Sequence, residues 1–434
     1  METMPKSPLV ARLQADDLAH SPIRKIMALA DRDNIVAMGL DPDEVISFAG
    51  GWVNHEAPAL MRAEYERIAA DARLFHQTGG YSPTKGLPAL REMLVRLDRE
   101  LYSGEGLSVD NVIIGQSSTQ LTYCLFTALL EAGDRVLLFD PTYANYAPQI
   151  ALLRDDIEIL SLPVLDTESW SYFADPDSIL ENLERMLVEQ HPKLLLFSTP
   201  DNPTGRLVPD QAFDEIVALT ARHGCMVAVD YAYRAQFFTE QQPAHFAVGP
   251  AQHENLIRIH SNSKWCRGLG RRLGWIEAAP DIVDALELVQ QGVILCPDTL
   301  HQVALAGYLE TALDDGSLRT YLEDSRQCYA RAARHMSRCI DEYLSMPYLQ
   351  PEGGLYTVVD VGCEAEALVY DILAATGVIF VPGAGFGATL ATAIRVSFGP
   401  LVNDLERMEE GFARVRRYLD ASPIAERGPT TASA

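Results

Sequence analysis

The residues that decide the fold of this chain lie between Asp201 and Trp275. Residues 201–205 read Asp-Asn-Pro-Thr-Gly, residues 229–234 read Val-Asp-Tyr-Ala-Tyr-Arg, residues 261–264 read Ser-Asn-Ser-Lys, and residues 272–275 read Arg-Leu-Gly-Trp. One lysine therefore stands among hydroxyl groups, with a carboxylate upstream and arginines downstream. Side chains of these types can hold an anionic aromatic cofactor, and the lysine amine can bond to it covalently.

Short apolar runs precede these segments and recur from residue 111 onward. The predicted strands are Asn111–Ile114, Arg135–Phe139, Ile157–Leu160, Lys193–Ser198, Cys225–Val229, Leu256–His260 and Leu273–Glu277. Most of them are apolar without alternation, as expected for strands buried on both faces, and helical patterns lie between them. The sequence thus predicts an α/β fold with a mostly parallel seven-stranded sheet sandwiched by helices.

The pattern changes after about residue 317 and predicts a second, smaller α+β domain. Helices are expected over about 321–344 and 364–375 and from about 403, with strands at 355–361, 378–381 and 393–398. The strand at 355–361 alternates as a half-exposed strand would. The predicted strand 45–49 and the helix that Ser21-Pro22 opens cannot form a core alone. We therefore expect residues 1–58 to pack with residues 321–434, which end in a disordered tail, around a large cofactor-binding domain at 59–320.

The composition of the chain limits which binding partners and which cellular compartment are expected for the protein. The 434 residues carry a net charge of −25, which disfavours nucleic acid and anionic membrane surfaces because both require clustered cations. The seven cysteines are odd in number and include no C-x-x-C pair, so neither a disulfide framework nor a zinc site is expected. No apolar run approaches membrane-spanning length, and the first residues lack a signal peptide's apolar region. We expect a cytoplasmic protein without a bound metal.

The polar residues at the predicted strand ends each allow two interpretations. Residues 117–119 open a helix whose N-terminus suits a phosphate, or they are a plain cap. Asp230 requires a proton or cation partner, which a pyridinium N–H or a structural arginine supplies equally well. Asn202 is a ligand or a turn residue, and Lys264 is a Schiff-base nucleophile or a solvated charge. Arg272 is a cofactor contact or a surface ion-pair partner.

Taken together and in order, the motifs resemble those of fold-type-I pyridoxal-phosphate enzymes, specifically the class I/II aminotransferases. The resemblance covers nearly the whole chain. The similar segments are Tyr81–Gly86, Asp140–Tyr143, Asp201–Gly205, Asp230–Arg234, Ser261–Lys264 with Arg272, Pro351–Gly354 and Ile394–Phe398.

The resemblance implies pyridoxal 5′-phosphate as the cofactor, bound to Lys264 as a Schiff base. Lys264 would also move the proton at the substrate Cα, with Asp230 holding the pyridine nitrogen protonated and Tyr233 as the third catalytic residue. Asn202 and Tyr233 would bind the ring hydroxyl, and Tyr143 would stack on the ring face. The implied phosphate contacts are Ser117, Ser118, Thr119, Ser261, Ser263 and Arg272.

The resemblance also implies contacts to the substrate and to a second subunit. Arg395 would bind the α-carboxylate of a small amino-acid substrate through a bidentate fork, with Gly50 and Asn202 as further substrate contacts. Tyr81 would reach the phosphate of the partner subunit, so the active unit is expected to be a homodimer with shared active sites.

Two N-terminal segments, Ser21–Arg24 and Ile46–Gly51, narrow the resemblance to one branch. They look like the branch of α-aminoadipate and kynurenine-type aminotransferases and of aminotransferase-like regulators. In that branch the N-terminal helix borders the substrate. Arg24 is thus either a side-chain contact or a solvated helix charge.

Several residues depart from the family pattern and leave the reaction open. Trp52–Glu56 replaces a usual Leu-Pro stretch, Tyr231 replaces a glutamate, and Ser117–Thr119 stands where Gly-Ala-Gln is common. The first hypothesis is transfer of an amino group from an L-amino acid to a 2-oxo acid. The second is another pyridoxal-phosphate reaction in specialised metabolism: β- or γ-elimination or replacement, cyclisation, or oxidation.

The choice between these reactions is expected to show at residues 52–56 and at Tyr231. His55 is either an additional acid or base or a solvated loop residue. A third hypothesis, a cofactor-binding transcriptional regulator, is disfavoured by the net charge of −25 and by the short segment that precedes the matching residues.

Overall fold

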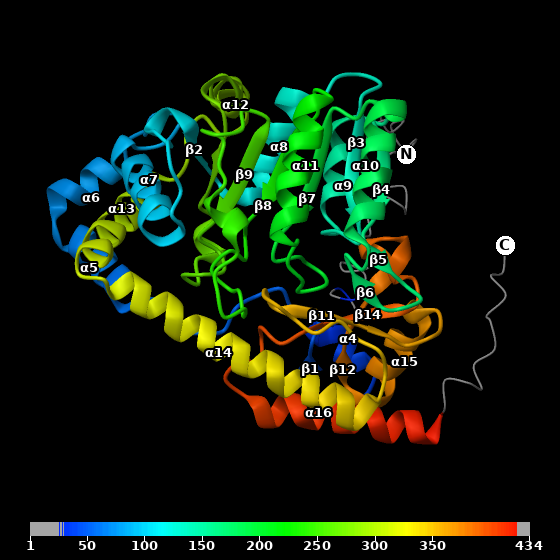
Figure 1. The fold of residues 1–434 in the computed structure, drawn as a ribbon. Helices are drawn as coiled ribbons and strands as arrows, with labels where there is room; N and C mark the ends of the chain where they lie inside the picture. Colours follow the sequence, from blue (N-terminus) through cyan, green and yellow to red (C-terminus); the bar gives the residue numbers. More distant parts are fainter. Residues whose placement is uncertain (1–25, 27, 29, 423–434) are drawn as a thin grey trace, which may run out of the picture.

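A seven-stranded sheet forms the centre of the larger part of the molecule (Figure 1). The computed structural model describes residues 26, 28 and 30–422. The strand order is β2 (Val112–Gly115), β10 (Gly274–Glu277), β9 (Leu256–Ser261), β8 (Met226–Asp230), β7 (Leu194–Ser198), β3 (Arg135–Asp140) and β4 (Glu158–Pro163). β10 is antiparallel to both neighbours, and the pairs from β9 to β4 are parallel. The predicted mostly parallel seven-stranded sheet is therefore confirmed.

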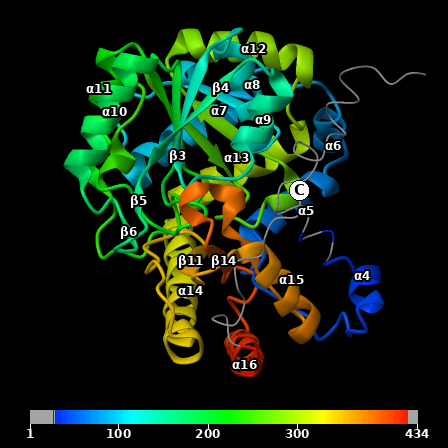
Figure 2. The ribbon, with the colours of Figure 1, turned by 90° about the vertical axis from the view of Figure 1, so that its right-hand side faces the viewer.

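Helices cover both faces of this sheet, because its inner strands are apolar on both sides. The helices of this part are α5 (Ala59–Ala70), α6 (Ala72–Thr78), α7 (Pro88–Tyr102), α8 (Ser117–Leu129), α9 (Tyr146–Leu153), α10 (Pro176–Gln190), α11 (Asp210–Arg222), α12 (Pro280–Val293) and α13 (Thr299–Asp314). Along β7, Leu194 and Leu196 join the core that packs under α8, α9 and α12. Leu195 and Phe197 join the opposite core, which includes residues of α10 and α11. Figure 2 shows α8, α9 and α12 on one side and α10 and α11 on the other.

The smaller part combines segments from both ends of the chain. Its elements are α4 (Arg32–Ala37), β1 (Ile46–Ser47), β11 (Tyr356–Asp360), α15 (Ala365–Thr376), β12 (Val378–Ile379), β13 (Val381–Pro382), β14 (Ala393–Ser397) and α16 (Leu405–Ala421). β1 pairs in parallel with β12, and β14 lies between β11 and β13. The N-terminal segment therefore packs with C-terminal residues, as a lone strand and helix must.

The long helix α14 (Ser317–Cys339) connects the two parts and continues as a π-helical turn at Ile340–Leu344. Figure 1 shows it running beneath the sheet and along α16. Buried side chains on one face, including Leu318, Tyr329 and Met336, attach it to the core. Its hydrophobic residues recur at helical spacing, which is why the sequence predicted this helix.

Some local predictions were wrong. The strand expected to be half-exposed at 355–361 is buried from Tyr356 to Val359 of β11, so side chains on both faces of this strand are covered. The single strand expected at 378–381 is two short strands in different sheets. Helices α5, α6, α12 and α13 and the hairpin of β5 (Leu165–Asp166) and β6 (Ser171–Tyr172) were not predicted. The expected helix start at Ser21-Pro22, Arg24 and the C-terminal tail lie outside the described residues.

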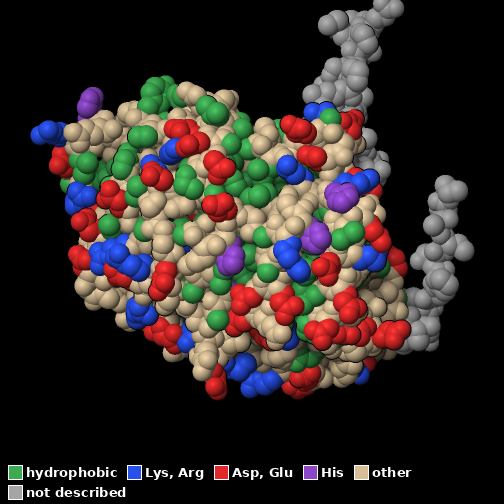
Figure 3. Space-filling model, turned by 45° about the horizontal axis from the view of Figure 1, so that its top comes forward, with side chains coloured by type: hydrophobic (Ala, Val, Ile, Leu, Met, Phe, Trp, Pro, Cys, Tyr) green, Lys and Arg blue, Asp and Glu red, His purple; other side chains and the backbone are tan. Residues whose placement is uncertain are grey.

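Charged side chains of both signs are spread over the face shown in Figure 3, with acidic ones gathered at its lower right. This distribution agrees with the net charge of −25. Within residues 26, 28 and 30–422, no helix is both long and apolar enough to cross a membrane.

Candidate active site

A pocket of about 410 Å³ lies where the carboxyl ends of β8 and β9 face the smaller part of the molecule. In open parallel sheets ligands bind at this edge. The lining includes these predicted residues: Gly50, Ser117, Ser118, Thr119, Tyr143, Asn202, Asp230, Tyr233, Ser261, Ser263, Lys264, Arg272 and Arg395. Tyr81 does not line it and is 87% exposed.

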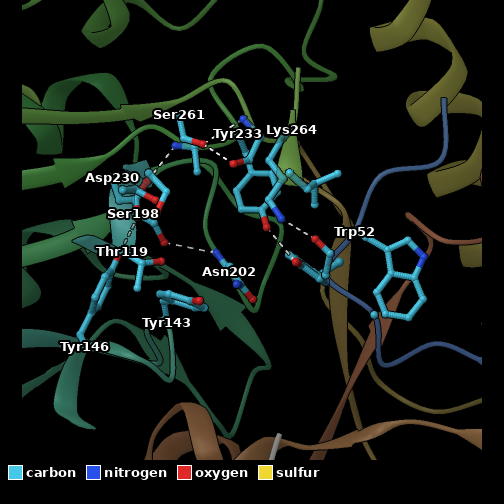
Figure 4. A pocket seen from close by; sticks show the side chains of 18 of the residues that line it. Trp52, Thr119, Tyr143, Tyr146, Ser198, Asn202, Asp230, Tyr233, Ser261 and Lys264 are labelled. Atoms are coloured by element: carbon cyan, nitrogen blue, oxygen red, sulfur yellow. Dashed lines mark hydrogen bonds between the residues drawn. The ribbon is translucent and has the colours of Figure 1, made fainter. Parts of the chain in front are cut away.

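Lys264 stands in the middle of the pocket, just after β9 (Figure 4). Its Nζ donates a hydrogen bond to the Gly51 carbonyl and lies 5.5 Å from the centre of the Tyr233 ring. Burial, with the nearby Arg395 guanidinium, lowers the pKa of Lys264 to about 8. A lysine with a depressed pKa supplies the neutral amine that attacks a carbonyl carbon. It is not the solvated surface charge that the sequence left open.

Asp230 ends β8 on the far side of the pocket from Trp52 (Figure 4). It accepts hydrogen bonds from the Ala232 N–H and the Tyr146 hydroxyl, both at 2.9 Å. Burial raises the pKa of this carboxyl. No arginine side chain bonds to it among the described residues, so it is suited to hold a protonated ring nitrogen.

Hydroxyls, a helix N-terminus and a guanidinium converge near the end of β9. Ser117 begins α8 without a side-chain cap, so the first N–H groups of the helix are available to an anion. Arg272 donates to Ser117 Oγ at 2.6 Å, and Ser261 Oγ donates to Ser263 Oγ at 2.6 Å. A Cβ on Gly274 would lie 2.8 Å from the Ser118 nitrogen, so only glycine lets β10 approach this turn. The arrangement has the chemistry of a phosphate site.

Arg395 reaches the pocket from β14 in the smaller part of the molecule. Its guanidinium donates to Asn202 Oδ1 at 3.0 Å and to the Ala49 carbonyl at 2.7 Å. Its Nε is buried and has no hydrogen-bond partner within the described part of the chain. A buried guanidinium with a free N–H is poised for a carboxylate, because leaving that donor unpaired is costly.

Several lining residues were not predicted. The hydroxyls of Tyr356 and Tyr233 share a hydrogen bond of 2.7 Å. The centre of the Tyr356 ring lies 4.4 Å from the Arg395 guanidinium. Tyr146 bonds to Asp230, and Leu269 and Trp52 also line the pocket. Tyr356 follows the Gly353-Gly354 turn and Tyr146 lies three residues beyond Tyr143, but neither spacing distinguishes a site residue from a core residue.

His55 is neither solvated nor part of the pocket lining. The residue is 6% exposed. Its Nδ1 lies 2.8 Å from the Tyr329 hydroxyl, and its Nε2 lies 3.2 Å from the Trp265 carbonyl. Burial lowers its pKa. His55 thus connects the loop after Gly51 to α14 and to the residue after Lys264. The expectation of a solvated side chain was wrong, and its position outside the lining gives no support to a role as acid or base.

Tyr231 also lies outside the pocket lining. Its hydroxyl donates to the His245 carbonyl at 3.2 Å, and its ring stacks against His260 in the core behind β9. The prediction that Tyr231 helps to choose the reaction receives no support from this position.

The Asp-Asn-Pro-Thr-Gly motif gains a structural explanation. Asp201 accepts bonds from Ser198 Oγ and Thr204 Oγ1, each at 2.7 Å, which hold the turn that presents Asn202. Gly205 has a φ of +69°, and its carbonyl accepts from the Glu352 and Gly353 N–H groups. The motif therefore joins the two parts of the molecule beside the pocket.

Comparison with known proteins identifies the family. The family model for aminotransferase class I and II matches residues 45–412. The chain belongs to this family. It is a pyridoxal-phosphate-dependent aminotransferase by family, as the motifs predicted.

The relatives of this aminotransferase match most of its length, but their sequence identity to it is low. It is 25% identical over 360 residues to an aspartate/prephenate aminotransferase of Thermus thermophilus, covering 82% of this chain and 89% of the relative. It is 24% identical over 320 residues to a probable kynurenine–oxoglutarate transaminase of Saccharomyces cerevisiae, covering 73% and 70%.

Solved structures confirm the fold. The aspartate aminotransferase from Thermus thermophilus with maleate aligns with a TM-score of 0.79 at 22% identity, covering 96% of this chain and 100% of the other. The aromatic aminotransferase from Pyrococcus horikoshii aligns with a TM-score of 0.77 at 22% identity, covering 92% and 99%.

The pocket of this chain fits the family's cofactor at both ends. The hydroxyls, helix N-terminus and Arg272 suit its phosphate, and the buried Asp230 suits a protonated pyridine nitrogen. Lys264 lies between these ends with a pKa suited to covalent attachment.

Proposed function

We propose that this enzyme transfers the amino group of an L-amino acid to a 2-oxo acid, with Lys264 as the Schiff-base residue. The observation that carries the proposal is the position of the Lys264 amine. It is half-buried and feels the charges of both Arg395 and Asp230, and desolvation lowers its pKa to about 8. When bound, pyridoxal 5′-phosphate serves as the electron sink for the carbanion formed at the substrate Cα.

In this proposal each predicted residue has one task at the cofactor. Asp230 keeps the ring nitrogen protonated, and Asn202 and Tyr233 bind the ring hydroxyl. Tyr143 stacks on the ring face. The phosphate is held by Ser117, Ser118, Thr119, Ser261, Ser263 and Arg272, and these residues all line one pocket.

The substrate side of the proposal rests on Arg395 and Lys264. Arg395 binds the α-carboxylate, for which its unpaired buried Nε is available. Gly50 and Asn202 line the same space. Lys264, once displaced by the substrate amine, moves the proton at Cα as general base and then general acid. Its depressed pKa suits both roles near neutral pH.

We also propose a homodimer with shared active sites in the cytoplasm, with a large domain at 59–320 and a small domain built from 1–58 and 321–434. Tyr81 is 87% exposed and follows α6, whose Phe75 is exposed as well. A partner subunit would bury this aromatic surface and receive Tyr81 at its phosphate. Mixing a Tyr81→Ala subunit with a Lys264→Ala subunit tests this, because a shared site restores one intact site in the mixed dimer. Activity no higher than the mean of the two parents would contradict it.

The experiment that tests the main proposal uses borohydride reduction of the cofactor-loaded enzyme, followed by peptide mapping. The chain has only five lysines, Lys6, Lys25, Lys85, Lys193 and Lys264. Modification is expected at Lys264 alone, and Lys264→Ala is expected to lose both the modification and the activity. Lys193→Ala, at an exposed position before β7, is the matched control. Full covalent labelling of another lysine would overturn the assignment.

The second reaction class, elimination, replacement, cyclisation or oxidation, is separated by product analysis. A panel of amino acids is incubated with the enzyme with and without a 2-oxo acid. Transamination requires the 2-oxo acid for turnover and converts it to an amino acid in equal amount. Turnover without the 2-oxo acid, with loss of a side-chain group or consumption of oxygen, would favour the alternative.

A further inference from the structure

Two large apolar side chains, Trp52 and Leu269, are among the residues that line the pocket, and we call them the outer rim. Figure 4 shows Trp52 on the opposite side of Lys264 from Asp230 and Thr119. Trp52 is 40% exposed, an unusual state for a large aromatic side chain beside a deep polar pocket. The mechanism proposed above assigns neither residue a task.

The indole of Trp52 is held in place by its surroundings. A Cβ on Gly50 would collide with three carbon atoms of the indole ring, so the ring lies directly over the glycine. The backbone of the loop is fixed on both sides. Ser397 Oγ donates to the Gly50 carbonyl at 2.6 Å, and Asn54 Nδ2 donates to the Pro400 carbonyl at 3.2 Å. The ring is therefore a preset wall of the pocket, which lowers the entropic cost of using it to bind a ligand.

The charged groups of the pocket are already committed elsewhere. Among the described lining residues the charged ones are Asp230, Lys264, Arg272 and Arg395. Three of them serve the cofactor in the proposed function, and Arg395 serves the α-carboxylate. The outer rim carries no charged group, so a charged substrate side chain placed against it would lose hydration without an ionic partner among the described residues.

The direction of the substrate side chain follows from these fixed points. In the proposed function, Asp230 and Ser261 would hold the cofactor, Lys264 would face the substrate Cα, and Arg395 would hold the carboxylate. Figure 4 shows Trp52 beyond Lys264 as seen from Asp230, so a substrate side chain that extends past Lys264 would meet the indole. We propose that Trp52 determines specificity, and that the amino donor carries a bulky uncharged side chain, above all an aromatic one, that packs on the indole. This inference rests on the proposed function.

The test compares the wild-type enzyme with Trp52→Ala, Trp52→Phe and Gly50→Ala. We measure kcat/KM for L-phenylalanine, L-alanine, L-aspartate and L-lysine. Wild type is expected to prefer L-phenylalanine. Trp52→Ala is expected to lose about 10- to 100-fold in kcat/KM for L-phenylalanine, mainly through KM, because an aromatic contact of this size is lost. The loss for L-alanine is expected to stay below about threefold, since its methyl group does not reach the indole. Trp52→Phe should retain most of the activity.

Gly50→Ala keeps the indole but displaces it, so it should reproduce the L-phenylalanine defect of Trp52→Ala. A binding measurement supports the kinetics without turnover. Cofactor-loaded enzyme is titrated with 3-phenylpropanoate and with succinate while the visible absorbance of the cofactor is recorded. Trp52→Ala should weaken 3-phenylpropanoate alone.

The outcomes distinguish failure of this inference from failure of the proposed function. If Lys264 carries the cofactor and amino transfer proceeds, but L-aspartate or L-lysine is preferred more than tenfold over L-phenylalanine, the inference alone is wrong. Equal losses for L-phenylalanine and L-alanine in Trp52→Ala would also overturn it. If no amino donor transfers its nitrogen to a 2-oxo acid, the proposed function itself fails.

Discussion

The two sides of the pocket are built in different ways. The inner wall, formed by residues 117–119, Asp230, Ser261, Ser263 and Arg272, consists of polar groups at strand ends and at a helix N-terminus. Two of these groups are bonded to helices: Asp230 accepts from Tyr146 of α9, and Arg272 donates to Ser117 of α8. In the outer rim, Trp52 lies on a loop and Leu269 begins a short 3-10 helix, and both side chains offer apolar surface.

This difference has a physical reason. Binding a charged cofactor demands preorganised polar groups, and those groups keep their positions only on rigid elements. Recognition of a side chain demands shape and apolar area, which a loop provides when its backbone is fixed. His55 provides that fixation by bonding to Tyr329 of α14 and to the Trp265 carbonyl. The inner wall should therefore control the chemistry of every substrate, and the outer rim should control the choice among substrates.

The largest effect is expected at Asp230 of the inner wall. Asp230→Asn removes the charge that holds the ring nitrogen protonated and should lower kcat by about 10²- to 10³-fold for all amino donors alike. Steady-state kinetics with two donors measures it. Asp201→Asn is the contrasting variant, because that buried carboxylate serves the turn and should affect thermal unfolding before kcat. If Asp230→Asn lowered kcat for one amino donor and not for the other, the inner wall would not control all substrates alike, and this prediction would be wrong.

The next effect concerns the anchor of the outer loop. His55→Leu removes the hydrogen bonds of the imidazole to the Tyr329 hydroxyl and the Trp265 carbonyl. The variant should lose about 1–3 kcal/mol of unfolding free energy. Its KM should rise more than its kcat falls. Tyr329→Phe removes one of the same bonds from the other side. In a double-mutant cycle the two changes should be non-additive, since they share that bond. Simple additivity would show that His55 does not hold the loop through α14.

A smaller effect concerns pH and the Lys264 amine. The pKa of Lys264 is lowered from 10.5 to about 8, so the neutral amine increases as pH rises through about 8. Between pH 7 and pH 9 the neutral fraction rises about tenfold. The rate at which cofactor-free enzyme captures pyridoxal 5′-phosphate, followed by absorbance, should rise by a similar factor and then level off. A rate still rising toward pH 10.5 would contradict the burial of this amine.

The smallest effect is expected at Tyr356, which lies between the two sides. Tyr356→Phe removes the 2.7 Å bond to the Tyr233 hydroxyl but keeps the ring beside Arg395. One buried hydrogen bond is worth about 0.5–1.5 kcal/mol, so kcat/KM should fall about two- to tenfold. The pH dependence of the bound cofactor's absorbance should shift as well, because Tyr233 is freed. Tyr343→Phe, which loses an exposed bond to Glu409, is the control and should leave both measurements unchanged.

Sequence patterns were sufficient for the inner wall and the sheet that carries it. Apolar runs without alternation predict buried parallel strands, and polar residues that follow such runs must gather at one edge of the sheet. Of the predicted cofactor residues, all but Tyr81 line the pocket. The assignment of Arg395 to the same site came from the family resemblance, because β14 lies far from β8 in the sequence.

The outer rim and its support could not be predicted. Trp52 and His55 share a short loop without periodicity, and nothing in their spacing says that one side chain faces the pocket and the other packs on α14. Tyr356 sits in a strand that looked half-exposed, and its side chain contacts Tyr233 and Arg395, which are distant in the sequence. Arg24 lies outside the described residues, so its role as a substrate contact remains a prediction.

The sequence by itself determined the sheet, the family and the cofactor lysine, because local hydrophobic patterns and short motifs encode strands and the groups that follow them. Only the tertiary structure decided which side chains surround Lys264 on its open side. Those contacts join residues near 50, 270, 330 and 356, which are brought together by packing between the two parts of the molecule. No local pattern in a single sequence records packing over such separations. The cofactor lysine could therefore be predicted from the sequence. The residues that line the pocket around a substrate side chain could be identified only from the tertiary structure.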